Sequence, residues 1–180
     1  MIKSFKSMSV TVLLGAFILL SFFLFGPPAR GADYSIVDNG ADLVFPVKVL
    51  TGDDLLVNAS NCPCLTVEVT VDTGWNVTLA CTDFSSGGAT IPSSSLSYTA
   101  TGGTLVKRDG QDVNPVNGPR ETGSTGTLNS PLTCLTCQAN FGHGSYDWQP
   151  DPGRFVLLIT ADRYAGSYTA TLTATISGGP

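Results

Sequence analysis

The sequence predicts an all-β protein: an antiparallel two-sheet sandwich of the immunoglobulin-like kind, with a small β-barrel as the alternative. Two observations support this fold class. Apolar and polar residues alternate with a period of two over several runs, as they do in strands that have one buried face. The 20 Gly and 11 Pro of the chain separate these runs, and the sequence shows no sustained helical periodicity.

Size and composition indicate one folded domain. The chain has 180 residues, of which 42% are hydrophobic and 13% are charged. A disordered chain would be more charged and less apolar, and a single core needs on the order of 100 to 200 residues. We therefore expect one sandwich domain and no disordered or repeat architecture.

The N-terminus has the layout of a secretory signal peptide. Lys3 and Lys6 precede an uncharged run, Val10–Phe25, and small residues follow at Ala29–Gly31. We expect residues 1–31 to be cleaved, which makes the protein secreted or cell-surface located. The alternative is a retained anchor, because the run is long for a signal peptide and short for a bilayer span.

Cleavage leaves residues 32–180, an acidic domain. The whole chain has a net charge of -5, and residues 1–31 contain basic but no acidic side chains. Nucleic-acid binding needs clustered Lys and Arg, so nucleic acid is excluded as a partner. We expect the partner to be a cell-envelope component, a polysaccharide or copies of the chain itself, and no membrane after cleavage.

The first half of the domain contains two clear strands. Residues 65–72 place Leu and Val on one face and Thr, Glu and Asp on the other, and residues 75–82 repeat this alternation. A three-residue turn, 72–74, would pair Val71 with Trp75 and keep one face apolar. Shorter strands are expected at 43–50, 55–58, 96–100 and 104–107.

The second half is predicted to begin with a loop and to end in two strands. Residues 113–131 are rich in Gly, Pro, Ser and Thr, which is typical of a long loop. Residues 154–161 are apolar on both faces, and residues 167–176 alternate without interruption. We expect these two runs to be core strands.

The five cysteines are expected to form disulfides, because export places them in an oxidising compartment. The candidates are Cys62, Cys64, Cys81, Cys134 and Cys137. The expected turn would bring Cys62 or Cys64 beside Cys81, Cys134 and Cys137 could close locally, and one thiol would remain. Less favoured alternatives are a zinc site that includes His143 and a redox-active Cys-x-x-Cys pair.

The sequence carries no catalytic signature, so we expect a protein that is not an enzyme. His143 is the single histidine and lies in a Gly-rich segment without a nucleophile-elbow motif. No cofactor is expected. Calcium is the alternative, because carboxylates occur in loose pairs that could converge in space, at Asp53 and Asp54, Asp109 and Asp112, and Asp147 and Asp151.

Two segments are candidates for partner binding. Tyr146, Asp147 and Trp148 are expected on a loop, where aromatic rings beside a carboxylate could grip a sugar, although Trp148 could equally fill one end of the sandwich. Residues 32–38 follow the cleavage site. They could be a strand donated to a neighbouring subunit or the first strand of their own sheet.

Parts of the chain resemble the WxL domains of Gram-positive cell surfaces and, more loosely, bacterial fimbrial and matrix-filament subunits. The resemblance lies in residues 74–79, 91–92, 96–98 and 166–176 and implies a secreted sandwich at the cell surface. Val77 replaces the Leu of the first Trp-x-Leu motif, and Gln149 and Pro150 follow Trp148. Because these departures fall on the family's motifs, attachment to peptidoglycan is not carried over.

Together these features predict a non-enzymatic secreted protein of the cell envelope that acts as a structural, adhesive or filament-forming module. The alternative is a carbohydrate-binding module that uses Tyr146 and Trp148. A fold of this kind hosts many functions, so the choice depends on the site.

Overall fold

The computed structural model describes residues 5–14 and 33–179, and this part of the chain is all-β. Strands make up 52% of the residues, and the only helical segments described are two short 3₁₀ turns, η1 (Ser93–Ser95) and η2 (Pro152–Arg154). The strands form three sheets that do not close into a barrel, so the barrel alternative is wrong. All ladders are antiparallel except the one between β1 and β3.

The largest sheet, sheet A, has the strand order β11-β13-β6-β16-β1-β3, with the β7–β8 hairpin attached to β16. Its strands are β1 (Phe5–Leu14), β3 (Leu43–Phe45), β6 (Trp75–Cys81), β7 (Phe84–Ser86), β8 (Ala89–Ile91), β11 (Arg120–Glu121), β13 (Leu132–Cys137) and β16 (Gly166–Gly178).

Two four-stranded sheets complete the fold. Sheet B has the order β10-β14-β5-β2, with β2 (Tyr34–Asp38), β5 (Leu65–Val69), β10 (Thr104–Gly110) and β14 (Gly144–Gln149). Sheet C has the order β12-β9-β15-β4, with β4 (Leu55–Asn58), β9 (Leu96–Thr99), β12 (Thr125–Thr127) and β15 (Phe155–Ile159).

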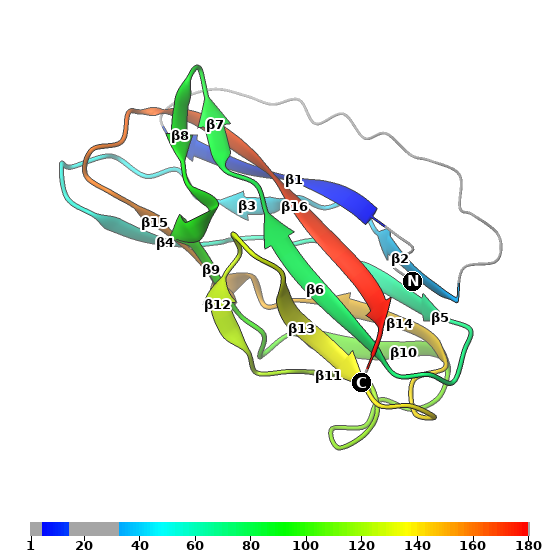
Figure 1. Cartoon of the computed structure of the whole chain (residues 1–180). Helices are drawn as coiled ribbons and strands as arrows, with labels where there is room; N and C mark the ends of the chain where they lie inside the picture. The colour runs from blue at the N-terminus through cyan, green and yellow to red at the C-terminus, as the bar shows by residue number, and fades with distance from the viewer. Residues whose placement is uncertain (1–4, 15–32, 180) are drawn as a thin grey trace.

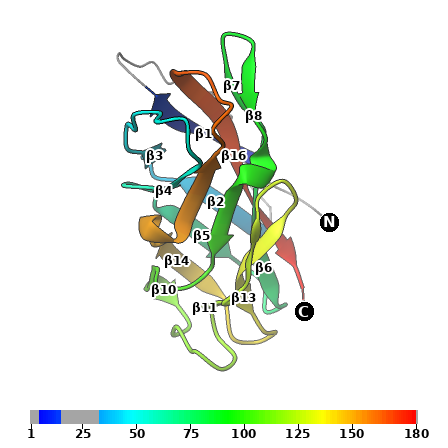
Figure 2. The ribbon, with the colours of Figure 1, turned by 90° about the vertical axis from the view of Figure 1, so that its left-hand side faces the viewer.

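The long strands β6 and β16 run diagonally across the molecule, with strands of sheets B and C behind them (Figure 1). Seen from the side, β6 and β13 lie to the right and β4, β14 and β10 to the left (Figure 2). One cluster of buried apolar side chains contains residues from all three sheets. Burial of this shared interior is the main stabilising contribution to the fold.

The alternation predicted for β6 and β16 is confirmed. In β6 every second residue from Trp75 to Cys81 is buried, and in β16 the same holds from Tyr168 to Ile176. The intervening residues of both strands are partly or fully exposed. These two strands are neighbours in sheet A, so their buried faces form a continuous part of the core.

The predicted turn between residues 72 and 74 does not form a hairpin, and the register derived from it is wrong. β5 pairs with β2 and β14 in sheet B, whereas β6 pairs with β13 and β16 in sheet A. The connection therefore crosses between sheets, because each strand buries its apolar face from a different side of the core. Strict alternation is equally compatible with a hairpin and with such a crossover.

The short strands predicted at 55–58, 96–100 and 104–107 are confirmed to within a few residues. The strand expected at 43–50 ends at Phe45, because Pro46 cannot donate a hydrogen bond to a ladder. The segment 113–131, expected to be a long loop, contains the short strands β11 and β12.

Within the expected segment 32–38, residues 34–38 form a strand of their own sheet, because β2 pairs with β5 along its whole length. The expected signal peptide overlaps β1. The other residues of the expected signal peptide, including the small residues 29–31, lie outside the described residues. No helix in the described part of the chain is long and apolar enough to cross a membrane.

Candidate strand-addition site

The strand β1 lies between β16 and β3 in sheet A. It pairs antiparallel with β16 from Phe5 to Leu14 and parallel with β3 over residues 10–12. The pairing with β16 covers all 10 residues of β1. Figure 1 shows β1 lying alongside β16, with β3 next to it. Residues 5–14, which belong to the segment that the sequence marks for export, are thus paired in the sheet.

β16 has separate hydrogen-bonded neighbours on its two sides. On one side it pairs with β6 and, at Thr169, with β7. Thr171 belongs to this side: its carbonyl accepts from the Thr82 N–H at 2.9 Å, and its N–H donates to the Thr82 hydroxyl at 2.9 Å. Because backbone groups alternate along a strand, the N–H groups of Ala170 and Leu172 point to the β1 side.

β3 depends on β1 for its place in the sheet. Within the described residues its ladder in sheet A is the one with β1, and the order β16-β1-β3 places β1 between it and β16. Besides this ladder, Val44 forms a single antiparallel bridge with Asn61. The position of β1 therefore has a strand on each side and is a slot in the sheet, unlike an ordinary open edge.

The residues that border this slot on its inner face are apolar and buried. Leu43 and Phe45 of β3 are 0% and 2% exposed, and Tyr168, Ala170 and Leu172 of β16 are at most 7% exposed. This burial is present with β1 in place. A strand in the slot is therefore part of the cover of the core, and apolar area of this kind stabilises by about 25 cal/mol per Å².

The register relates the sequence of residues 7–12 to both faces of β16. The Cα partners of the buried Leu172, Ala170 and Tyr168 are Met8, Val10 and Val12. The partners of the outward residues of β16 are hydroxyl residues, paired as Ser7 with Thr173, Ser9 with Thr171 and Thr11 with Thr169. The segment has the period-two pattern that this position requires.

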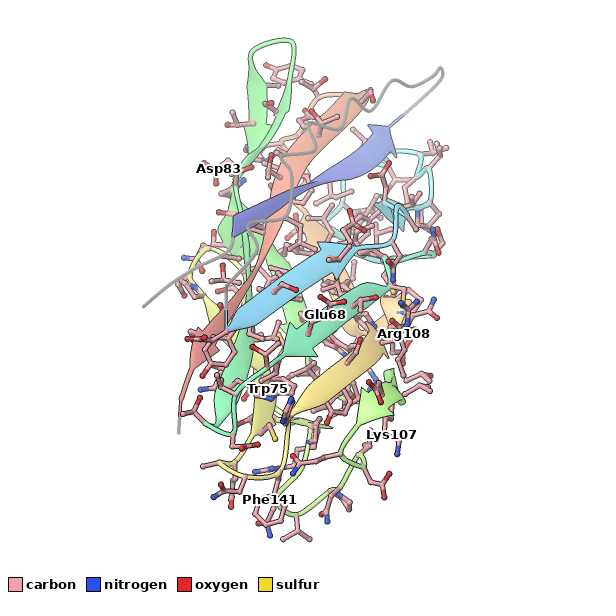
Figure 3. All side chains as sticks on the ribbon, turned by 90° about the vertical axis from the view of Figure 1, so that its right-hand side faces the viewer. Glu68, Trp75, Asp83, Lys107, Arg108 and Phe141 are labelled. Atoms are coloured by element: carbon pink, nitrogen blue, oxygen red, sulfur yellow. The ribbon has the colours of Figure 1, made fainter. Side chains whose placement is uncertain are left out.

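The outer face of β16 is uncharged. Its partly or fully exposed residues are Ser167, Thr169, Thr171, Thr173, Thr175 and Ser177. Like charges placed opposite each other destabilise strand pairs, and none is present here to oppose an incoming strand. Charged residues that would protect an edge from pairing lie elsewhere, for example Lys107 and Arg108 on the edge strand β10 (Figure 3).

The five cysteines are free thiols in the structure. The crossover between β5 and β6 removes the register from which a bridge of Cys62 or Cys64 with Cys81 was expected. Burial raises the pKa of Cys62, Cys81 and Cys134 to about 12 and that of Cys137 to about 11. Thiols of this kind are protonated at neutral pH and react slowly, while Cys64 is partly exposed.

Tyr146 and Trp148 do not form an exposed aromatic loop, and that prediction is wrong. Both lie on β14, and both side chains are 0% exposed. The Tyr146 hydroxyl donates to the Gln111 carbonyl at 2.9 Å, and Trp148 Nε1 donates to Glu121 at 3.1 Å. Alternation along β14 turns both rings into the core, so neither ring face can stack on a sugar.

Asp147 is on the opposite face of β14 and belongs to a polar network. Its two carboxylate oxygens accept from the Thr66 hydroxyl at 2.7 Å and from Arg108 Nε at 2.6 Å. Partial burial opposes ionisation, but the hydrogen bonds from Thr66 and Arg108 together lower the pKa of Asp147. Arg108 lies on the outer side of sheet B, as does Glu68 on β5 (Figure 3).

The remaining candidates are dispersed. The His143 Nδ1 lies 3.4 Å from Asp72, and both side chains are more than half exposed. The paired carboxylates bind protein groups: Asp54 accepts from the Ala161 N–H, and Asp112 pairs with Lys107. Among the described residues no group of three or more His, Cys, Asp or Glu could hold a metal ion.

Reasoning from the sequence missed the strand character of residues 5–14, although the signal was present. Ser, Met, Ser, Val, Thr and Val alternate over residues 7–12. The neighbouring apolar run, which continues to Phe25, made an export signal the stronger interpretation. The strand pattern and the export signal therefore overlap in residues 7–12.

Comparison with known proteins adds no relative that would assign a function to the slot. No family model matches the chain, and no curated protein and no solved structure matches it significantly.

Proposed function

We propose that this chain is a non-enzymatic secreted protein of the cell envelope, a structural module that assembles with further copies of itself by strand addition. The observation that carries the proposal is the slot between β16 and β3, which is occupied by residues 5–14. The sequence marks these residues as part of an export signal. Once the signal is removed, the mature chain has to fill this position with another strand.

The shape of the slot restricts what can fill it. Because β16 and β3 lie on either side of the stretch filled by residues 10–12, an incoming strand must be free of partners on both of its own edges there. A strand inside a folded sheet cannot meet this condition, whereas a terminal segment can. Extended terminal segments that add to a neighbour's sheet are a recognised mode of assembly.

The N-terminal strand of a second copy is the donor that we propose. β2 begins at Tyr34, close to the expected cleavage site, and β5 is its one ladder partner among the described strands. Tyr34 and Ile36 provide apolar residues at alternate positions. Leaving its own sheet costs one ladder of 5 residues and exposes the core around Ile36, which a strand added from another copy would have to cover again.

The proposal includes the immunoglobulin-like arrangement predicted from the sequence. The shared cluster of buried side chains from sheets A, B and C supports a sandwich in which inner faces meet. In such a sandwich a missing strand uncovers part of the core, so its replacement is favoured by apolar burial as well as by backbone hydrogen bonds.

Light scattering coupled to size-exclusion chromatography tests the proposed assembly. The folded full chain, with a specific protease site introduced after Gly31, is cleaved, and residues 32–180 are measured with and without reductant. We expect species larger than the monomer that persist in reductant. A monomer at every concentration would contradict the proposal, and so would assemblies that dissolve in reductant, because disulfides would then hold them.

A competing peptide provides the matched control. A synthetic peptide of residues 5–14 should occupy the slot and prevent assembly. A peptide of the same composition in which the apolar residues are consecutive should not, because it lacks the period-two pattern. If the two peptides act alike, the effect is one of general hydrophobicity and the slot is not the assembly site.

A further inference from the structure

We propose that residues 5–14 are an intramolecular cap: they fill the slot of their own chain and keep it closed to other copies until the N-terminal segment is removed. This inference rests on the proposed function, since it concerns control of the same position. The proposed process is a strand exchange in which the cap leaves the slot and a terminal strand of a second copy enters it.

The first observation behind the cap is that residues 5–14 pair with β16 along their whole length and that residues 10–12 among them also pair with β3. The antiparallel ladder with β16 and the parallel ladder with β3 meet in the same three residues, 10–12. Backbone groups of a strand that is paired on both sides are satisfied without water. A segment that merely lay over the core would not show this double pairing.

The second observation is the match of the residue pattern to the register. Val10 is the Cα partner of both Ala170 and Leu43, which are 7% and 0% exposed. Thr11, the next residue, is the partner of Thr169 and Val44, of which Thr169 is exposed. A shift of one residue would exchange these two classes over residues 7–12, so the pattern of these six residues favours the observed register.

The third observation concerns the connection. Residues 15–32 join β1 to the segment that begins β2, and a stretch of this length can span up to about 60 Å. The chain can therefore place the cap in its own slot without unfolding β2. Because the cap is covalently attached, its effective concentration is high, and a free strand from another copy competes poorly while the attachment lasts.

Amide hydrogen exchange on the full chain, held in detergent micelles, tests the cap with an internal control. On β16 the N–H groups of Ala170, Leu172 and Ala174 point to β1, whereas those of Thr171 and Thr173 point to β6. We expect both sets to be protected in the full chain. Exchange of the β1-side set should be at least about tenfold faster once the cap is displaced.

Two substitutions that introduce the same side chain at neighbouring positions test whether amide protection depends on the register of the cap. Val10→Asp places a charge at the position paired with buried residues and should release the β1-side amides alone. Thr11→Asp places the same charge one residue further, at the position paired with the exposed Thr169, and should leave both sets protected. Retained protection on the β6 side shows that each variant is folded.

The inference is overturned if the β1-side amides of the full chain are unprotected, or if Val10→Asp and Thr11→Asp exchange alike. Light scattering after cleavage tests the proposed function separately, because it measures whether residues 32–180 assemble. Assembly of residues 32–180 together with an unprotected full chain refutes the cap and retains the proposed function. A protected full chain whose cleaved product stays monomeric refutes the proposed function and retains the cap as a strand of the fold.

Discussion

The two sides of β16 differ in what holds them. On one side β6 runs next to β16 from Trp75 to Cys81, inside the continuous part of the domain. On the other side the neighbour is β1, which comes from the far N-terminus and carries β3 with it. The same strand with one alternating pattern thus meets a neighbour from the continuous part of the domain and a neighbour that we propose to be exchangeable. A regular strand pattern does not by itself reveal which of its edges is complete.

Strong destabilisation is expected on the β6 side. Trp75 is 0% exposed, and its Nε1 donates to the Gly142 carbonyl at 3.0 Å. Trp75→Ala should lower the free energy of unfolding by about 3–5 kcal/mol, because it leaves a cavity and an unpaired carbonyl. Urea denaturation measures this loss. Tyr164→Ala, at a side chain 77% exposed, is the control and should change stability by less than about 0.5 kcal/mol. Similar losses of unfolding free energy in the two variants would contradict the importance of Trp75 packing on the β6 side.

A smaller loss is expected where the chain packs against Trp75. A Cβ added to Gly142 would lie 2.3 Å from Cys137 Sγ and 2.4 Å from Trp75 Nε1. Gly142→Ala should therefore destabilise by about 1–3 kcal/mol through overpacking. Gly153→Ala is the matched control, because its nearest neighbour is a carboxylate oxygen of Asp151 at 3.2 Å. The expectation fails if thermal unfolding does not separate the two variants.

A single side-chain hydrogen bond just beyond the end of β6 should contribute less again. Thr82→Ala removes the hydroxyl that accepts from the Thr171 N–H and should cost about 0.5–1.5 kcal/mol. Thr82→Ser retains that hydroxyl and should be near neutral. Exchange of the Thr171 amide reports the bond directly. An unchanged exchange rate in Thr82→Ala would show that water replaces the hydroxyl without loss.

The smallest effect is a pH dependence at the start of β7. Hydrogen bonds from the Ser93 N–H and hydroxyl to Asp83, at 2.7 and 2.8 Å, lower the pKa of Asp83. A carboxyl whose folded pKa lies below its unfolded value stabilises the fold above the unfolded pKa of about 4, and this contribution disappears as pH falls through the folded pKa. Denaturation of the wild type and Asp83→Asn from pH 7 to pH 2 should show a difference that shrinks on acidification. A difference independent of pH would contradict the ionic origin.

Much of the fold could be predicted from alternation alone, because burial of one face imposes it directly. The strands at 75–81 and 166–178 and the burial of Trp75 and Tyr168 follow from this rule. The disulfide pairing could not be predicted in this way. The pairing depends on which strands are neighbours. A crossover and a hairpin place the same residues inward, so alternation does not distinguish between them.

The candidate site shows the same division. The sequence of residues 7–12 already contains the pattern of a strand, and the uncharged run to Phe25 already indicates export. The strand that carries Tyr146 and Trp148 was expected to be a loop because Gly and Pro flank it, and such flanks are common to loops and short strands, whereas burial of Trp148 was one of the alternatives.

By itself the sequence determined the all-β class, the inward faces of the long strands and the acidic, weakly charged character of the chain, because these depend on the residues of each segment alone. Only the tertiary structure decided that β5 and β6 lie in different sheets and that β1 separates β3 from β16. The physical reason is that strand partners are chosen by the shared burial of residues far apart in the chain. A local pattern constrains the faces of a strand but not the identity of its neighbours.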